Sequence, residues 1–363
     1  MSGDTHRTMA TLERLLRPER ERHVVEMRLV SLPGNVPPWT PTGVVVRRGE
    51  WMSILASGRL VLSPELDLWM APSFALWGRI GGRGPIFNGT RDTVSFRADR
   101  DGALELAIYN GEWASPEGDL ATPVEAYAGS GGTIDALVIR WRGDARESLA
   151  GLLASDPSLA GDPLLASELE RLRHPIEPPA GWRHLWFLGP TECFRAGTED
   201  GRPAVHVDTA NTVGILQKPI EFPLGQATTL SWRWRVDELP AAGAEDTPIA
   251  HDYMSLALEF ESGKDLTWYW SAALPVGTHY ACPLPTWAAR ETHWVVRSGA
   301  AGLGRWHEER RVVADDYRAA VGPVPARIVG AWFIAVSVFR HGRGRAAFAD
   351  VILRDGVREL RVV

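Results

Sequence analysis

The sequence predicts an all-β protein made of two antiparallel β-sandwich domains joined by a short helical connector. At 363 residues the chain is too long for one ordinary hydrophobic core and suits two domains. Short apolar or alternating runs separated by Gly, Pro, Asn and Asp fill most of it, which is typical of antiparallel sandwiches. Two pairs of tryptophans, in SWRWRV and LTWYWS, are spaced two residues apart, so each pair shares one face of a strand.

The first half of the chain begins with an N-terminal segment, residues 1–30, in which 8–28 have the apolar spacing of a charged helix. The first sandwich is expected over residues 31–143. It opens with a proline-rich stretch, 31–43, in which a helix is excluded. Runs such as TVSFRADRDG, ALELAIYNGEW and GGTIDALVIRW then have the pattern of strands with tight turns.

The second half starts with the connector, residues 144–180. Its first part is helix-forming, with breaks expected at Pro157 and Pro163, and its last part is the linker PIEPPAG. Short strands return over residues 181–363 in HLWFL, PAVHVDT, TTLSWRWRV, YMSLALEFE, LTWYWSAAL, HWVVRSG and AWFIAVSVF. The segment DDYRAAVG is the one helix expected among them.

Composition narrows the classes of partner. The formal net charge is −6 and the isoelectric point about 6.0, which argues against a nucleic-acid partner because such a protein needs a basic face. The N-terminus lacks the apolar core of a signal peptide, and no run of 18 apolar residues occurs, so we expect a cytoplasmic protein with no membrane partner. The two cysteines, Cys193 and Cys282, cannot by themselves build a disulfide framework or a cysteine-based zinc site.

Strand alternation in the second domain separates apolar from polar positions. It directs the following polar residues to one side of a sheet: Arg233, Arg235, His251, Tyr253, His293 and Arg297. Arginine forks bind carboxylates and phosphates, so such a face suits an anionic or polyhydroxylated ligand. Tryptophans such as Trp268 and Trp270 suit stacking on a sugar ring. The alternatives are a solvated face for the polar residues and a buried sheet face for the tryptophans.

Three further signals are weaker. Asp252 follows His251 directly, so it points to the opposite face of a strand, where a buried carboxylate needs a partner such as an arginine. The motif RWHEERRVV lacks the second histidine of a HExxH zinc site. Cys282 has no evident activating partner and is interpreted as a packed thiol.

The segments ALWGRIGG, GPIFNG and AIYNG, followed by GGTIDALVIRW, resemble the bacterial calcium-dependent galactophilic lectin family over about residues 40–141. The resemblance implies a small jelly roll in which the loop after the IYN strand binds calcium and sugar. The matching candidates are Asn110, Glu112, Glu117 and Asp119. All four carry the hard oxygen ligands that suit calcium. Of these, we expect Asn110 and Asp119 to be calcium ligands. The family's loop is rich in Asn and Asp, whereas this one contains Trp113 and Pro116, so a solvated loop without any cofactor is the alternative.

Residues 181–356 resemble a bacterial domain family of unknown function. The resemblance rests on LSWRWRVDELP, HDYMSLALEF, LTWYWSAALPVGTHY and HWVVRSGAAGLGRWHEERRVVADDYRAAVG. It implies a jelly-roll sandwich and carries no activity. Where that family often has an acidic loop after the AWFIAVSV strand, this chain has the basic FRHGRGR.

Two functions follow from these residues. The first is binding of a small molecule, carbohydrate or glycoside by a Trp- and Arg-rich site that includes Arg233, Arg235 and Arg297. The second is a cofactor-independent lyase or cyclase acting on a natural-product intermediate in a Trp-lined cavity. It would use His251, Tyr253 or His293 as catalytic acid or base. A jelly roll supports either use, so the fold alone does not decide between them.

Overall fold

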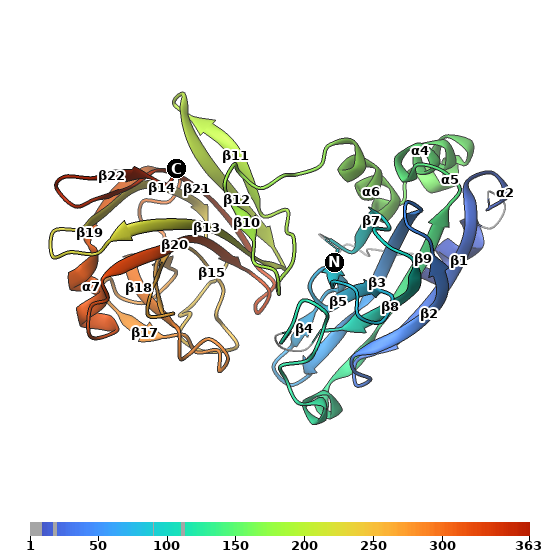
Figure 1. Cartoon of the computed structure of the whole chain (residues 1–363), viewed down its shortest axis with the longest axis horizontal. Helices are drawn as coiled ribbons and strands as arrows, with labels where there is room; N and C mark the ends of the chain where they lie inside the picture. Colours follow the sequence, from blue (N-terminus) through green and yellow to red (C-terminus); the bar gives the residue numbers. More distant parts are fainter. Residues whose placement is uncertain (1–8, 17–19, 90, 110–112) are drawn as a thin grey trace. The chain divides into compact units, whose positions relative to one another are not determined.

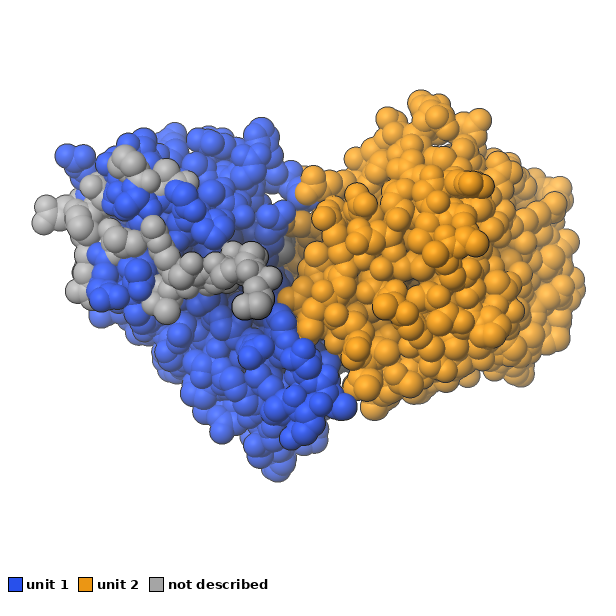
Figure 2. All heavy atoms as spheres, turned by 180° about the vertical axis from the view of Figure 1, so that it is seen from behind, with its two compact units in different colours: residues 1–176 blue, residues 177–363 orange. Residues whose placement is uncertain are grey.

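The computed structural model describes residues 9–16, 20–89, 91–109 and 113–363, and the chain divides into two compact units. Unit 1 is Met1–Ile176 and unit 2 is Glu177–Val363 (Figures 1 and 2). Both are β-sandwiches, so the predicted fold class is confirmed. In the described part of the chain no helix has the length and apolar character of a membrane span.

Unit 1 is a sandwich of a five-stranded and a four-stranded sheet. Its strands are β1 (Val24–Pro33), β2 (Trp39–Val46), β3 (Trp51–Ser63), β4 (Leu68–Met70), β5 (Leu76–Ile80), β6 (Phe87–Asn88), β7 (Thr93–Arg97), β8 (Gly102–Ile108) and β9 (Gly131–Trp141). One sheet has the order β1-β9-β3-β4, with β7 also paired to β3, and the other β2-β8-β5-β6. Alternate residues such as Ile54 and Val138 from the first sheet and Leu104 and Leu106 from the second fill the space between them.

The described part of unit 1 also contains seven short helices. They are α1 (Met9–Leu16), α2 (Arg20–His23), α3 (Pro72–Ala75), the 3-10 helix η1 (Val124–Gly129), α4 (Ala145–Ser155), α5 (Pro157–Ala160) and α6 (Pro163–Arg173). Among them, α1, α4 and α6 pack on the outer face of the five-stranded sheet. Leu12, Leu149 and Leu165 from α1, α4 and α6 form a second apolar cluster with Leu137 and Ile139 of β9. The helical stretch interpreted as a connector therefore packs within unit 1 (Figure 1).

Unit 2 is a larger sandwich. Its elements are β10 (Arg183–His184), β11 (Phe194–Glu199), β12 (Arg202–Ala210), β13 (Val213–Pro223), β14 (Thr229–Glu238), β15 (Tyr253–Phe260), β16 (Asp265–Ser271), β17 (His279–Ala281), β18 (Glu291–Ser298), β19 (Trp306–Val312), α7 (Val313–Ala320), β20 (Arg327–Val336), β21 (Arg343–Arg354) and β22 (Glu359–Arg361). The seven-stranded sheet has the order β10-β13-β20-β15-β16-β18-β17. The six-stranded sheet has the order β11-β12-β21-β14-β19, with β22 paired to β21.

The core of unit 2 lies between these two sheets and is rich in aromatic side chains. Trp232 and Trp234 of β14 face Trp268 and Trp270 of β16, and all four are at most 1% exposed. Indole rings bury a large apolar area, so this stack is a main source of stability for the unit. The tryptophan pairs therefore have the buried role that the sequence left as an alternative.

Two local features differ from the expected pattern. The N-terminal helical segment ends earlier than residue 28, because β1 begins at Val24 and pairs with β9 along most of its length. In unit 2, β16 and β18 pair parallel, because the intervening β17 lies on the outer edge and pairs antiparallel with β18. All other strand pairs among the described residues are antiparallel.

Candidate ligand groove and buried polar cluster

The outer face of the six-stranded sheet carries an arginine-rich groove. On β14, Trp232 and Trp234 point into the core, so Arg233 and Arg235 point out of the sandwich, as alternation requires. Both guanidinium groups lie over the ring of Trp306 on the neighbouring β19, at 5.0 and 5.4 Å from its centroid. The aromatic face therefore orients two arginines through cation–π contacts.

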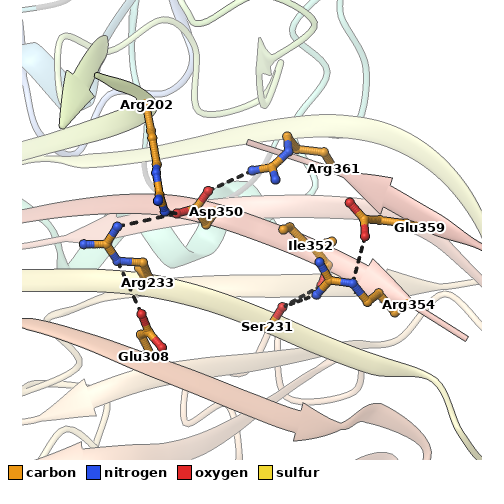
Figure 3. Close-up of polar contacts among 9 residues, drawn as sticks. All are labelled: Arg202, Ser231, Arg233, Glu308, Asp350, Ile352, Arg354, Glu359 and Arg361. Atoms are coloured by element: carbon orange, nitrogen blue, oxygen red, sulfur yellow. Dashed lines mark hydrogen bonds and ion pairs between the residues drawn. The ribbon is translucent and has the colours of Figure 1, made fainter. Parts of the chain in front are cut away.

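The groove is open and has a volume of about 340 Å³. It crosses β12, β14, β19 and β21, and its lining residues are Arg202, Ser231, Trp232, Arg233, Glu308, Glu309, Arg310, Asp350 and Ile352. Figure 3 shows the polar contacts among most of these side chains, together with their neighbours Arg354, Glu359 and Arg361. The lining thus contains three arginines and three carboxylates, and its formal charge is balanced.

Asp350 is the centre of this network. Arg202 and Arg361 donate to its two carboxylate oxygens at 3.0 and 2.8 Å, from opposite sides (Figure 3). Partial burial raises the pKa of Asp350, but the hydrogen bonds from the two arginines outweigh it and hold the pKa below its ordinary value. The carboxylate is therefore ionised at neutral pH and available as an acceptor.

Arg233 is held less tightly than its neighbours. Its guanidinium lies 3.6 Å from Asp350, 3.7 Å from Asp200 and 3.9 Å from Glu308, distances longer than a hydrogen bond. Within the described residues it makes no hydrogen bond, although its side chain is only 20% exposed. Arg233 thus presents N–H donors that are oriented by Trp306 and remain available at the groove.

The histidines and the tyrosine predicted as catalytic lie elsewhere, on the outer face of the seven-stranded sheet. His251, Tyr253 and His293 are 1%, 3% and 0% exposed. Their rings touch one another, with centroids 4.6 to 4.8 Å apart. Cys282 and Glu291, at 2% and 3% exposure, complete a cluster that we call the buried polar cluster.

Hydrogen bonds fix two members of the buried polar cluster. Glu291 accepts hydrogen bonds from the Tyr253 and Thr267 hydroxyls, at 3.0 and 3.1 Å, on the same carboxylate oxygen. His251 Nδ1 lies 2.7 Å from the backbone oxygen of Glu245. A carbonyl oxygen only accepts hydrogen bonds, so Nδ1 of His251 carries the proton. Nε2 of the same ring is unprotonated, and its lone pair can accept a hydrogen bond or bind a metal ion.

Four side chains of this cluster turn their donor atoms toward one point. The nitrogen, sulfur or oxygen atoms by which His251, Cys282, Glu291 and His293 could bind a metal ion all lie within 4.8 Å of one another.

Burial, and then the nearby His293, lower the pKa of His251 to about 3, so its imidazole is neutral. Burial raises the pKa of Glu291, whereas His293 and His251 lower it more, to about 2. Burial and then Glu291 raise the pKa of the Cys282 thiol.

The six residues expected on one polar face do not share a face in unit 2. Arg233 lines the groove, and Arg235 lies on the same outer face but outside the lining, where it pairs with Glu199 and Asp237. The two histidines and the tyrosine lie in the buried polar cluster. Arg297 lies on neither outer face, although its side chain is 32% exposed. A register shift between Tyr269 and Trp270 reverses the alternation of β18, so Arg297 turns toward Trp270 and pairs with Glu309.

The other predicted site residues have structural surroundings. Trp268 and Trp270 donate their indole N–H groups to Asp316 and to the backbone oxygen of Gly299, both at 2.9 Å, inside unit 2. Asp252 is fully buried, as alternation implies, but its partners are the backbone N–H groups of Phe339 and Arg340, at 3.0 and 2.7 Å. The expected arginine partner is thus replaced by main-chain donors.

The predicted calcium loop of unit 1 is only partly described. Asn110 and Glu112 lie outside the described residues. The exposed Asp119 accepts a hydrogen bond from the Ser115 hydroxyl at 2.7 Å, so its carboxylate helps to close a tight turn. Glu117 contributes its backbone oxygen to Arg79 at 3.2 Å.

Reasoning from the sequence did not select Arg202, Asp350, Cys282 or Glu291 as site residues. The first two come from strands that are far apart along the chain and become neighbours only through the pairing of β12 with β21. A local signal did exist for Glu291, which stands two residues before His293 and therefore shares its face of β18.

Comparison with known proteins agrees with the division into two units. Residues 180–352 match the family model described as "Protein of unknown function (DUF3047)", which spans just under half of the chain. The matched segment coincides, except for Ala180 at its start, with part of the segment 181–356, whose sequence resembles a family of unknown function. No curated protein matches the chain.

Several solved structures show weak similarity. The "EclA N-terminal domain; PllA-like lectin" is 19% identical, with a TM-score of 0.25, over 33% of this chain and 98% of that one. The xyloglucanase domain of NopAA from Sinorhizobium fredii is 12% identical, with a TM-score of 0.27, over 48% and 99%. The family 30 carbohydrate-binding module of a Clostridium thermocellum cellulase is 11% identical, with a TM-score of 0.26, over 49% and 88%. Scores this low assign no function to this chain.

Proposed function

We propose that unit 2 binds a neutral polyhydroxylated small molecule, a saccharide or a glycoside, in the groove on the outer face of its six-stranded sheet. The observation that carries this proposal is the composition of the lining. Three arginines and three carboxylates stand within one groove of about 340 Å³, a volume suited to one or two sugar rings.

The balance of charge favours hydroxyl groups over an ion. An anionic ligand would meet Glu308 and Asp350, and a cationic one would meet Arg202 and Arg233, so each would be repelled by part of the lining. A hydroxyl group donates one hydrogen bond and accepts others, and a sugar ring carries several. It can therefore donate to the carboxylates and accept from the arginines at once.

Arg233 is the residue we expect to contact the ligand most directly. Its carboxylate neighbours lie beyond hydrogen-bond distance, so a ligand oxygen would gain donors without displacing a short bond. The cation–π contact with Trp306 holds the guanidinium plane before binding. Losing a hydrogen bond to a charged donor costs about 1.5–3 kcal/mol, so Arg233→Ala should weaken binding roughly 10- to 100-fold.

The test is a calorimetric titration of the whole chain with galactose, glucose, mannose, β-linked disaccharides, and one uronic acid. We expect neutral sugars to bind the wild type and Arg233→Ala to bind them at least tenfold more weakly. Arg354→Ala is the matched control, because Arg354 lies on the same face and contacts Ser231 and Glu359 but does not line the groove. The proposal fails if no neutral sugar binds, or if both variants weaken binding equally.

The alternative function, acid/base catalysis by a lyase or cyclase, rests on the proximity of His251, Tyr253 and His293. Their side chains are at most 3% exposed, so a substrate could reach them only if the covering segments opened. The groove is open to solvent without any rearrangement. For this reason we favour ligand binding at the groove.

A further inference from the structure

We propose that the buried polar cluster of unit 2 is a zinc site in which His251, Cys282, Glu291 and His293 are the four ligands. The ligands come from three segments of the chain. His251 lies two residues before β15, Cys282 directly follows β17, and Glu291 and His293 stand on β18. This site lies on the other sheet from the groove, so it is independent of the proposed function.

The strand pairing explains how the ligands meet. Glu291 and His293 are two residues apart on one strand and so project from the same face. Cys282 is brought beside them because its backbone N–H donates to the backbone oxygen of Glu291 at 2.9 Å. This hydrogen bond extends the pairing of β17 with β18. His251 arrives from β15, which is separated from β18 by β16 alone.

The distances fit a tetrahedral ion. Zinc binds nitrogen and oxygen ligands at about 2.1 Å and sulfur at about 2.3 Å, so neighbouring ligand atoms of a tetrahedron are about 3.4–3.7 Å apart. In the structure Cys282 Sγ lies 3.5 Å from His251 Nε2, and Glu291 Oε1 lies 3.5 Å from His293 Nε2. All four donor atoms lie within 4.8 Å of one another, so small side-chain movements would close the remaining edges.

His293 supplies an independent observation. It is 0% exposed, and neither of its ring nitrogens has a hydrogen-bond partner among the described residues. A buried polar group without a partner costs free energy, and such groups are rare in native proteins. A metal ion at the centre of the cluster would satisfy the ring nitrogen that faces it.

The surroundings resemble those of known metal sites. His251 is oriented by the hydrogen bond from Nδ1 to the backbone oxygen of Glu245, which leaves Nε2 directed at Cys282. The carboxylate of Glu291 is held by the hydroxyls of Tyr253 and Thr267. Hydrogen bonds of this kind from outer groups fix the orientation of ligands before the ion arrives.

Charge and donor chemistry select the ion. A thiolate and a carboxylate together carry two negative charges, so a divalent cation makes the buried site neutral and avoids an uncompensated charge. The thiolate and two imidazoles disfavour magnesium and calcium, which prefer oxygen ligands. Four protein ligands in a tetrahedral arrangement are typical of a structural zinc site.

We infer that the ion has a structural role. The four ligands are at most 3% exposed, so no position is open to a substrate. The ion would join residue 251, in the segment before β15, and residue 282, at the end of the edge strand β17, to β18. Bound metal should therefore stabilise unit 2, because the unfolded chain has no preformed site.

The experiment measures metal in the whole chain and uses the second cysteine as a control. Zinc is quantified by elemental analysis after purification without chelator, then removed by a chelator and replaced by Co²⁺. We expect about one zinc per chain, together with tetrahedral cobalt absorption in the visible range and a thiolate-to-cobalt charge-transfer band. Cys282→Ser should lose the charge-transfer band. Cys193→Ser should keep it, because Cys193 is equally buried in unit 2 but contacts Thr191.

Tyr253→Phe gives a second readout if Cys282→Ser does not fold. It keeps all four ligands and removes one hydrogen bond to Glu291, so zinc affinity should fall about 10-fold or more with the cobalt spectrum retained. The proposal is overturned if folded wild-type protein contains no zinc and gives no tetrahedral cobalt spectrum. It is also overturned if the charge-transfer band depends on Cys193 and not on Cys282.

Discussion

Our main prediction concerns the replacement of Trp268 by phenylalanine. This substitution distinguishes a packing role of the paired tryptophans from a ligand-binding role. The side chain is 0% exposed between the two sheets of unit 2. Its indole N–H donates to a carboxylate oxygen of Asp316 at 2.9 Å. Arg311 holds the same carboxylate with two hydrogen bonds, at 2.7 and 2.6 Å, so Asp316 keeps partners in the variant.

The expected loss of stability has two parts. Trp268→Phe removes three buried ring atoms, which at about 0.8 kcal/mol per buried CH₂-sized group amounts to roughly 2 kcal/mol. The lost hydrogen bond to an ionised carboxylate adds about 1.5 kcal/mol, at the low end of its range because Asp316 remains paired. We therefore expect the free energy of unfolding of unit 2 to fall by about 3.5 kcal/mol.

Hydrogen exchange of unit 2 peptides across a urea series measures this quantity without interference from unit 1. Trp294→Phe is the matched control. Trp294 pairs with Trp268 across β16 and β18, but its indole is only half-buried and stacks on His279 at 4.7 Å. The control should cost less than about 1 kcal/mol.

Two outcomes would refute this reasoning about Trp268. A loss of stability no larger than that of Trp294→Phe would show that the indole is not a principal packing element. A loss of sugar binding in Trp268→Phe with unchanged stability would place the side chain at the ligand instead of in the core.

Two other predictions concern buried and surface carboxylates. Asp252→Ala removes the buried acceptor of two partly buried backbone N–H groups in the loop after β20, so unit 2 should lose about 1–3 kcal/mol of stability in the same exchange measurement. A loss below about 1 kcal/mol would show that the loop finds other acceptors. For Asp350, partial burial raises the pKa, but Arg361 and Arg202 lower it more, so its ionised form is favoured in the folded state. Its contribution is therefore present above the unfolded pKa of about 4 and is lost as the pH falls through the lower folded pKa. The melting temperatures of wild type and Asp350→Asn should converge below about pH 4, and a gap independent of pH would contradict this.

The sequence predicted the local part of this structure well. Alternation along β14 correctly directed Trp232 and Trp234 to one face and Arg233 to the other. It succeeded because the two faces of a strand differ with a period of two residues, whatever the neighbouring strands are. The helices after residue 144 were also recognisable from composition and from their prolines, and in the structure Asp144 and Asp162 are the N-caps of α4 and α6.

Alternation failed where the strand is irregular. The register shift opposite Trp270 turns Arg297 away from the side of His293, and no residue pattern in HWVVRSG announces that shift. It also could not show that His251 and Cys282, which are 31 residues apart, bring their donor atoms to 3.5 Å. That contact depends on the loops that cover the sheet.

The sequence by itself determined the all-β class and the division of most strands into apolar and polar faces. These properties follow from residue periodicity and turn chemistry, which act over a few residues. Only the tertiary structure decided which polar faces are exposed and which are closed. The order of strands in a sheet is set by contacts between distant segments, so it alone brought Asp350 beside Arg202 and Glu291 beside Cys282.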